Sequence, residues 1–382
     1  MIPIKYNLRN LVVRWKTTAM TAAGFTLVVT ALIVMLAFYN GVQRVCSISG
    51  ERQNVLVLSK GYTDELLSEM DRSAVTHVLN AKGVMRGADG RRLASRELYS
   101  VITLPGAAKG EYLMLDIRGV TADALAVHRQ VKVVAGRMFQ ANRSELVVGA
   151  AASRSHGLKL GSTLKMGHKS WTVVGVIAAE GSSFESEVWC NLAELAGTFR
   201  RGGVCTTIVL RTHSPEAADR LVARLKDLTT TPVEAMTEHT YYARQARYAE
   251  PFRTAAFVIA AFMAFGVGFG VMTTMYAAIG QRRKEIAVMR VLGYSSRQIL
   301  LSFLFEALLI AAFGAILGVL LGYSTNGLTQ NIELKGKEVA IAFQVDLQVI
   351  LLASYFALGT GLLGGILPAR SAMQVGALEA LR

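Results

Sequence analysis

The sequence predicts a membrane α-helical protein with four transmembrane helices and a large extracytoplasmic α+β domain inserted between the first and second helices. Three observations predict this fold class. The 382 residues are 52% hydrophobic, with a mean hydropathy of +0.38, which is too apolar for an ordinary soluble protein. Four uncharged runs reach the roughly 20 residues that a bilayer demands; they are Thr17–Gln43, Thr254–Gln281, Ala307–Ile332 and Leu347–Ala369. A long stretch of mixed composition separates the first run from the second.

Residues 1–16 are expected to form an amphipathic elbow helix at the inner leaflet. Leu8, Leu11, Val12 and Trp15 share one helical face, and the basic side chains lie away from it. Trp15 suits an interface, which favours this helix over an unstructured basic tail. The apolar run that follows starts late and is too long for a cleavable signal peptide, so residues 17–43 are expected to be the first span.

Residues 44–238 are expected to form the extracytoplasmic domain, because their apolar residues recur at strand and short-helix periods. Both ends of this stretch read as strand, helix and strand, which indicates one α/β part made from two related halves. One of these helices is expected to begin at a cap formed by Thr63 and Asp64 and to end near Leu79. Short strands with glycine turns predict a β-rich insertion at about residues 110–200.

The three cysteines, Cys46, Cys190 and Cys205, fall in the predicted outer region. An odd count excludes a complete disulfide framework. Cys190 and Cys205 can pair if the strands that carry them are neighbours, and the alternative is buried free thiols. The sequence leaves this choice open.

The remaining segments are expected to be a stalk and second span at residues 239–281, a third span at 298–323, an outer loop at 324–346 and a fourth span at 347–369. Pro251 can kink the helix of the stalk. Small residues recur at four-residue spacing in these spans, which predicts close helix packing in lipid. The glycines concerned are Gly266, Gly270, Gly314, Gly318, Gly322, Gly361 and Gly365. Glu306 is the one charge among the apolar stretches, and we expect it either to snorkel to the interface or to pair with a nearby arginine.

The short loop at residues 282–297 is the most basic connection between the predicted spans. It carries five basic residues against the single acid Glu285. The positive-inside bias therefore places this loop, and with it both termini, in the cytoplasm. Most of the net charge of +14 lies near segments predicted to be cytoplasmic, so topology and anionic membrane lipid account for it without nucleic acid.

Within this loop, Ile286, Met289 and Leu292 recur at helical spacing, which predicts a short amphipathic helix. Gly293 is a natural stop for that helix, because glycine readily adopts the left-handed conformation. Ser295 followed by Gln298 predicts a capping box that opens the next helix.

The order Glu285-Ile-Ala-Val-Met-Arg-Val-Leu-Gly293, followed by Ser-Ser-Arg-Gln-Ile299, resembles the cytoplasmic loop of ABC transporter permeases of the MacB/FtsX/LolC family, the FtsX-like mechanotransmission family. Pro368-Ala-Arg370 and Glu379-Ala-Leu-Arg382, in the cytoplasmic tail at 370–382, resemble the end of such chains. The resemblance covers the spans, elbow and tail well and the outer domain loosely. It implies an α/β porter-like part with a small β part, and a coupling helix that contacts an ATPase through Arg282, Arg283, Lys284, Glu285, Ile286, Met289, Arg290, Leu292 and Gly293.

The sequence offers no enzymatic constellation, so no catalytic, cofactor-binding or metal-binding residues are expected. No G-x-x-x-x-G-K-[ST] motif occurs, and Gly157–Gly161 is followed by Ser-Thr without the lysine, so ATP is expected to bind a separate ATPase chain. The six histidines form no H-E-x-x-H motif. Ser182 and Ser183 lack the G-x-S-x-G frame.

These expectations describe a permease subunit in the bacterial cytoplasmic (inner) membrane that couples ATP hydrolysis elsewhere to movement of its outer domain. The resemblance implies a dimer with a second copy or a paralogue, an ABC ATPase, and a membrane-fusion adaptor or lipoprotein carrier. The cargo would be a lipoprotein, a lipid-linked compound or a periplasmic compound. Two alternatives remain: an FtsX-like signalling scaffold that regulates a cell-wall hydrolase, and a membrane-anchored outer enzyme.

Overall fold

The computed structural model describes residues 4–105, 112–227, 232–334 and 336–374, and it divides into two compact units. The helical unit comprises residues 1–41, 249–328 and 342–382. The sheet unit comprises residues 42–248 and 329–341. The chain therefore passes between the two units four times. Glu379–Arg382, the second of the two tail segments that resemble the family, lies outside the described residues.

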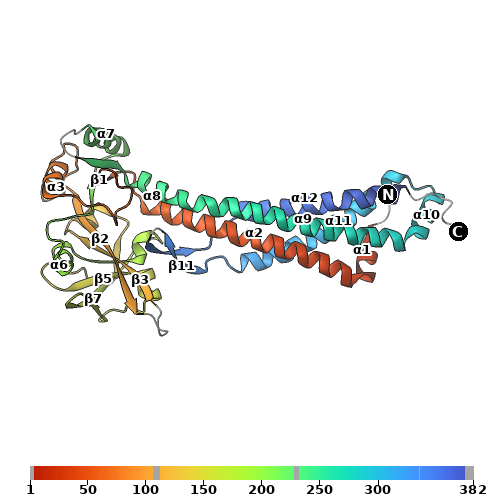
Figure 1. Ribbon diagram of the computed structural model, residues 1–382, viewed down its shortest axis with the longest axis horizontal. Coiled ribbons are helices and arrows are strands. Elements are labelled where there is room, and N and C mark those ends of the chain that lie inside the picture. Colours follow the sequence, from red (N-terminus) through yellow and green to blue (C-terminus); the bar gives the residue numbers. More distant parts are fainter. Residues whose placement is uncertain (1–3, 106–111, 228–231, 335, 375–382) are drawn as a thin grey trace. The chain divides into compact units, whose positions relative to one another are not determined.

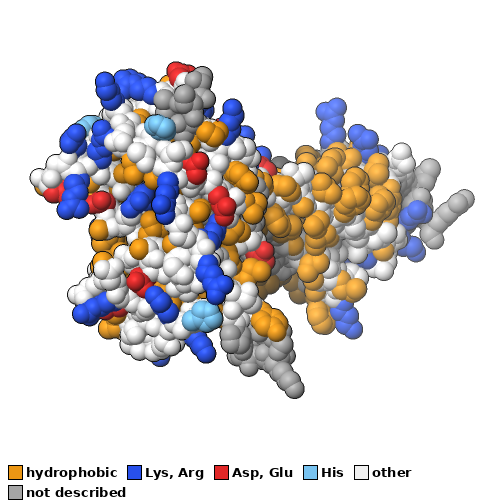
Figure 2. Space-filling model, turned by 60° about the vertical axis from the view of Figure 1, so that its left-hand side comes forward, with side chains coloured by type: hydrophobic (Ala, Val, Ile, Leu, Met, Phe, Trp, Pro, Cys, Tyr) orange, Lys and Arg blue, Asp and Glu red, His pale blue; other side chains and the backbone are white. Residues whose placement is uncertain are grey.

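The helical unit is made of α1 (Ile4–Val13), the larger part of α2 (Trp15–Ser49), α9 (Glu250–Gln281), α10 (Arg283–Val291), α11 (Ser296–Tyr323) and α12 (Leu347–Met373) (Figure 1). In the described part of the chain, four helices are long and apolar enough to cross a membrane: α2, the run Glu238–Gln281, α11 and α12. Figure 2 shows hydrophobic side chains over much of the visible face of this unit, as expected of a surface in lipid. The predicted fold class is confirmed.

Glycines set the closest helix contacts in this unit. A Cβ added to Gly314, Gly318 or Gly322 of α11 would lie 2.5 to 2.7 Å from side chains of α2. This close approach brings the Thr30 hydroxyl within 3.2 Å of the Gly318 carbonyl oxygen, to which it donates a hydrogen bond. On α12, Gly361 and Gly365 lie in the same way against alanines of α11.

Gly266 and Gly270 of α9 behave differently, since a Cβ added to either would meet no described atom within 4 Å. Neither glycine therefore packs closely against another described helix of this chain, and helix packing at Gly266 and Gly270 stays a prediction. α9 approaches α12 closely through a different glycine, Gly268. A Cβ added to Gly364 of α12 would lie 2.9 Å from the Gly268 carbonyl oxygen. Spacing alone cannot tell which glycine face of a helix meets a partner, because several faces of α9 carry small residues.

Substitution of valine for Gly318 is expected to lower the free energy of unfolding by about 1–3 kcal/mol, because the new Cβ would overlap Val29 at 2.6 Å. The same change at Gly266 is the matched control and is expected to leave stability nearly unchanged. The measurement is the amount of monodisperse protein that remains after heating in detergent. Equal losses for both variants would contradict the packing described here.

The sheet unit is built on one large sheet. In the described residues ten strands form it, in the order β10-β1-β9-β2-β3-β8-β5-β7-β4, with β6 paired to β7. The strands are β1 (Asn54–Ser59), β2 (Ala94–Pro105), β3 (Tyr112–Val120), β4 (Lys132–Gly136), β5 (Glu145–Gly149), β6 (Thr163–Met166), β7 (Lys169–Ala178), β8 (Glu187–Asn191), β9 (Thr207–Arg211) and β10 (Val233–Thr237). The antiparallel pairing of β2 with β3 makes the β-rich segment continuous with the α/β part, and the parallel pairing of β3 with β8 extends the sheet within that segment.

The two faces of the sheet differ: one is apolar, and the other carries buried charged side chains beside apolar ones such as Leu56 and Val209. α3 (Arg72–Leu79) and α7 (Pro215–Lys226) pack on the apolar face, and α6 (Leu192–Thr198) packs farther along it against Leu98 and Ile117. Strand residues alternate between faces. Glu97, Tyr99 and Arg118 therefore lie on the opposite face, where they are fully buried. The remaining short helices of the unit are α4 (Ala124–Val127), α5 (Ala150–Ser155), η1 (Ser183–Ser186), α8 (Glu238–Ala246) and η2 (Arg247–Ala249).

Three local features differ from the sequence expectations. α3 begins at Arg72 rather than near Thr63, because the Asp71 side chain accepts the Ala74 N–H and caps it, while Asp64 caps only a turn. The stalk helix is interrupted at η2, and Pro251 lies in the first turn of α9, where its missing N–H disturbs nothing. The outer loop forms a hairpin of β11 (Thr329–Leu334) and β12 (Lys337–Ala342). All three cysteines are free and buried.

Candidate functional site

The segment between α9 and α11 folds into a short helix closed at both ends. Arg282 is the N-terminal cap residue of α10 and Leu292 its C-terminal cap residue. Gly293 then has φ +91°, the left-handed conformation that ends a helix at little cost. Ser295 and Gln298 form the expected capping box, in which each side chain accepts the backbone N–H of the other residue.

One face of α10 is turned into the helical unit. Ile286 is fully buried and Met289 packs against the same core. The Arg282 guanidinium is buried, 3.4 Å from the Glu306 carboxylate and over the Phe303 ring. Of the two roles expected for Glu306, snorkelling and pairing with an arginine, the structure shows the pairing. Arg290 donates to the Ser296 hydroxyl and so ties α10 to α11. These contacts position the helix rather than present it to a partner.

The other face of α10 is available to a partner. Arg283, Lys284 and Glu285 are exposed, as is Gly293. Leu292 is 71% exposed, and two residues that the sequence reasoning missed, Val288 and Val291, are 50% and 67% exposed. The pattern alone placed Leu292 with Ile286 and Met289, but the helix ends at Leu292 and turns it outward. We call Val288, Val291 and Leu292 the α10 tip. Three exposed aliphatic side chains beside basic residues suit a protein interface better than free solvent.

The sheet unit holds a buried ion network on the face of its sheet opposite α3, α6 and α7, which sequence reasoning did not find. Arg118 of β3 is its centre, and its guanidinium lies 2.6 to 2.8 Å from the carboxylates of Glu65, Glu97 and Glu187. All four side chains are at most 5% exposed. Burial opposes the charge of Arg118, but the surrounding carboxylates raise its pKa well above the ordinary value.

His128 extends the network, since its two ring nitrogens lie 2.8 Å from Glu97 and 3.3 Å from Glu238. Burial disfavours the imidazolium, but these carboxylates outweigh it and raise the pKa of His128 to about 10. Burial likewise disfavours the carboxylate of Glu97, and His128 with Arg118 outweighs it and lowers its pKa to about 2. The network is therefore fully charged at neutral pH at these positions.

Lys337 brings the β11–β12 hairpin into the same network. Its Nζ lies 3.4 Å from Glu65 and 3.7 Å from Asp64, and it donates to the Tyr241 hydroxyl at 3.1 Å. The ammonium also lies 4.3 Å from the centre of the Tyr99 ring. The hairpin, which interrupts the chain between α11 and α12, is thus fastened to the sheet by a buried charge.

Asp116 closes the network next to the hairpin. It accepts from the Tyr99 hydroxyl at 2.6 Å and from the Glu338 backbone N–H at 3.0 Å, both at Oδ2. Burial, together with the nearby charge of Glu187, outweighs the hydrogen bonds from Tyr99 and Glu338 and raises the pKa of Asp116 to about 7. In the described residues no group of three His, Cys, Asp or Glu side chains is placed to hold a metal ion.

This pKa predicts a pH dependence of stability. An unfolded aspartate titrates at about pH 3.9, so the folded chain holds an extra proton between that pH and about 7. The stabilisation from protonated Asp116 is present at low pH and is lost as the pH rises through 7. The midpoint of thermal unfolding is therefore expected to fall between about pH 5.5 and pH 8 in the unaltered chain. The midpoint of the Asp116→Asn variant, whose amide imitates the neutral carboxyl, should fall less over the same range. Equal falls in the two proteins would contradict the raised pKa of Asp116.

The chain is similar to two known domain families. The domain family described as MacB-like periplasmic core domain matches residues 18–228, and the one described as FtsX-like permease C-terminal matches residues 257–377. The macrolide export ATP-binding/permease protein MacB of Photorhabdus laumondii is 26% identical over 238 residues, which cover 58% of this chain and 35% of that protein. An uncharacterized ABC transporter permease of Bacillus subtilis, YvrN, is 33% identical over 113 residues, 30% of this chain and 26% of that protein.

The chain thus spans about a third of the length of the MacB proteins it matches. Among solved structures, the periplasmic region of MacB from Actinobacillus actinomycetemcomitans is similar, with 13% identity and a TM-score of 0.39. That match covers 51% of this chain and 94% of the other. The relatives are permease components of ABC transporters.

Proposed function

Because this chain belongs to the MacB/FtsX family of ABC transporter permeases, we propose that it couples ATP hydrolysis by an ABC ATPase to movement of its sheet unit outside the cytoplasm. The observation that carries this proposal is the outward face of α10. That face joins the α10 tip to exposed basic residues, and its inner face is fixed to the bundle by Ile286 and by the Arg282–Glu306 pair. A force applied to such a helix reaches α9 and α11 together.

The charge distribution supports the proposed orientation. The basic residues of the loop at 282–297 favour the cytoplasmic side, which would put both termini there and the sheet unit on the other side of the membrane. The ATPase would then contact α10 from the cytoplasm through Arg283, Lys284, Glu285 and the α10 tip. Arg282, Ile286, Met289 and Arg290, expected at the same contact, would support it from behind.

Movement would reach the sheet unit where the chain passes between the units. Two of these passages flank the β11–β12 hairpin, at residues 328–329 and 341–342. The hairpin is held to the sheet by Lys337 and by the Ala340 backbone N–H, which donates to the Ser186 hydroxyl at 2.8 Å. Displacement of α11 and α12 would therefore pull on the buried ion network and not on a free loop.

The work done outside the membrane would be export or extraction of a lipoprotein, a lipid-linked compound or a periplasmic compound. A second copy or a paralogue would complete the permease, and a membrane-fusion adaptor or lipoprotein carrier would receive the cargo. The names of the relatives reported above mention export and permease activity. None mentions a cell-wall hydrolase, so the signalling alternative is not favoured.

The orientation and the partner can be tested in one preparation. Val134→Cys in β4 and Val288→Cys in α10 are made separately in a chain whose three cysteines are replaced by serine, and the chain is co-expressed with the ABC ATPase encoded nearest to it. A membrane-impermeant maleimide should label the cysteine at position 134 in spheroplasts. It should label the cysteine at position 288 only in inside-out vesicles, and bound ATPase should reduce that labelling. Labelling of both cysteines from the same side would overturn the proposal.

A further inference from the structure

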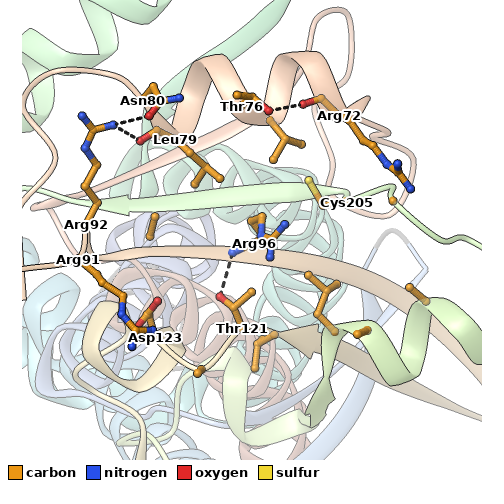
Figure 3. Close-up of a pocket in the computed structure, with 18 of the residues that line it drawn as sticks. Arg72, Thr76, Leu79, Asn80, Arg91, Arg92, Arg96, Thr121, Asp123 and Cys205 are labelled. Atoms are coloured by element: carbon orange, nitrogen blue, oxygen red, sulfur yellow. Dashed lines mark hydrogen bonds between the residues drawn. The ribbon is translucent and has the colours of Figure 1, made fainter. Parts of the chain in front are cut away.

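An open groove of about 1160 Å³ crosses the apolar face of the sheet between α3 and α6. Five arginines and one carboxylate line it together with small and apolar side chains. The arginines are Arg72, Arg86, Arg91, Arg92 and Arg96. Figure 3 shows Arg72 on α3, Arg91 and Arg92 in the segment before β2, and Arg96 on β2 itself. The groove lies wholly within the sheet unit.

Arg96 is the unusual residue of this groove. The register of β2 puts it on the same face as Ala94 and Leu98, which are both buried under helices. Arg96 is exposed, because α3 and α6 separate above it and leave the groove. Its backbone N–H donates to the Thr121 hydroxyl at 3.3 Å. Among the described residues, no carboxylate lies within 4.0 Å of its guanidinium, so this cation stands in the floor without a partner of opposite charge.

Neighbouring groups shape the positions of the other cations. The Arg72 side chain lies over Gly203. A Cβ added to Gly203 would lie 2.5 Å from Arg72 Nε, so any other residue at position 203 would displace the Arg72 side chain. The Arg92 guanidinium donates to the Leu79 carbonyl oxygen and to Asn80 Oδ1, which fixes it at the end of α3 (Figure 3). Arg86 donates to the Gly90 carbonyl oxygen. Arg91 pairs with Asp89, and both are at least half exposed.

Apolar side chains lie between these arginines, together with the uncharged polar residues Thr76, Asn80, Thr121 and Asn191. Val75 and Leu79 of α3 face Leu192 and Ala196 of α6 across the groove. Asp123 is the single acid in the lining, and its carboxylate does not cap the helix that follows it. Guanidinium groups donate in a planar fork that matches phosphate and carboxylate oxygens. The groove therefore combines a cationic floor and rim with apolar sides.

We propose that this groove binds an anionic amphiphile, a molecule with a phosphate or comparable headgroup on a short apolar body. Arg96 and Arg72 contact the headgroup, and the apolar walls from α3 and α6 cover the body. Five arginines against Asp123 leave a large excess of positive charge that such a headgroup neutralises. The binding is an equilibrium property of the sheet unit and does not require the ATPase.

The test uses the full chain in nanodiscs of zwitterionic lipid and isothermal titration with hexyl phosphate. Inorganic phosphate tests the charge alone, and hexyl glucoside tests the apolar body alone. Hexyl phosphate is expected to bind at least tenfold more tightly than either, with an affinity that falls as salt rises. Arg96→Gln and Arg72→Gln should each weaken it about tenfold. Arg154→Gln, an exposed arginine of α5 outside the groove, is the matched control and should not weaken it.

Asp123→Asn gives a change of opposite sign, since removal of the one negative charge should tighten hexyl phosphate by about two- to fivefold. A second series in nanodiscs that contain phosphatidylglycerol distinguishes two sources of the headgroup. Competition by the bilayer would assign the site to membrane lipid, and unchanged affinity would assign it to a free amphiphile. Equal affinity for hexyl phosphate and hexyl glucoside, or equal losses in the Arg96 and Arg154 variants, would overturn the proposal.

Discussion

Substitution of methionine for Arg118 is expected to destabilise the sheet unit by about 3–5 kcal/mol, a large part of the stability of a typical domain. The change removes the donor shared by three buried carboxylates and leaves Glu187 without its guanidinium partner. Trp189 reports on the result, because its indole Nε1–H donates to Glu187 Oε2 at 3.0 Å and its ring is fully buried. The measurement is unfolding of the full chain followed by tryptophan fluorescence.

Arg137→Met is the matched control for this experiment. Arg137 also pairs with a glutamate, Glu145, at 2.7 Å, but its side chain is 46% exposed. An exposed pair contributes about 0–1 kcal/mol, because water and salt screen it. If both variants lost the same stability, burial would not be the cause, and the network would be no more than a surface feature. If Arg118→Met folded normally, the described network would be wrong.

The elements that the sequence predicted correctly depend on local composition. The four spans follow from long uncharged runs, which any membrane helix needs because lipid offers its backbone no partners. The capping box joins Ser295 and Gln298, which are three positions apart, so the sequence alone shows both partners. The same holds for the helix stop at Gly293.

The buried ion network could not be predicted in this way, because its members are far apart in the chain. Arg118 meets Glu65 across 53 positions and Lys337 meets Glu65 across 272. Each of these residues alone reads as an ordinary surface charge. The groove has the same origin, since Arg72 and Arg96 come together only when α3 packs on the sheet. The strand register would have given one signal, an arginine at position 96 on an otherwise apolar face.

The α10 tip shows a limit of periodicity. Spacing grouped Leu292 with Ile286 and Met289, but α10 is nine residues long and the chain turns at Gly293. The face that meets the bundle is set by the Arg282–Glu306 pair as much as by apolar spacing. Val288 and Val291 are consequently the exposed partners of Leu292. This reassignment identifies the side chains whose change should affect coupling most.

Substitution of aspartate for Val291 is expected to lower permease-dependent ATP hydrolysis about tenfold or more, because a carboxylate would then be buried against the ATPase in place of an aliphatic anchor. The chain should still fold, since Val291 is 67% exposed in the free permease. The measurement is ATP hydrolysis by the reconstituted complex, with a melting curve of each variant. Val134→Asp is the matched control: it makes the same change at a valine of β4 that is 60% exposed, and ATP hydrolysis should persist. Full ATP hydrolysis with the Val291 variant would show that the ATPase does not use this face of α10. Loss of ATP hydrolysis in both variants would indicate a general effect of added charge and would remove the case for a coupling helix.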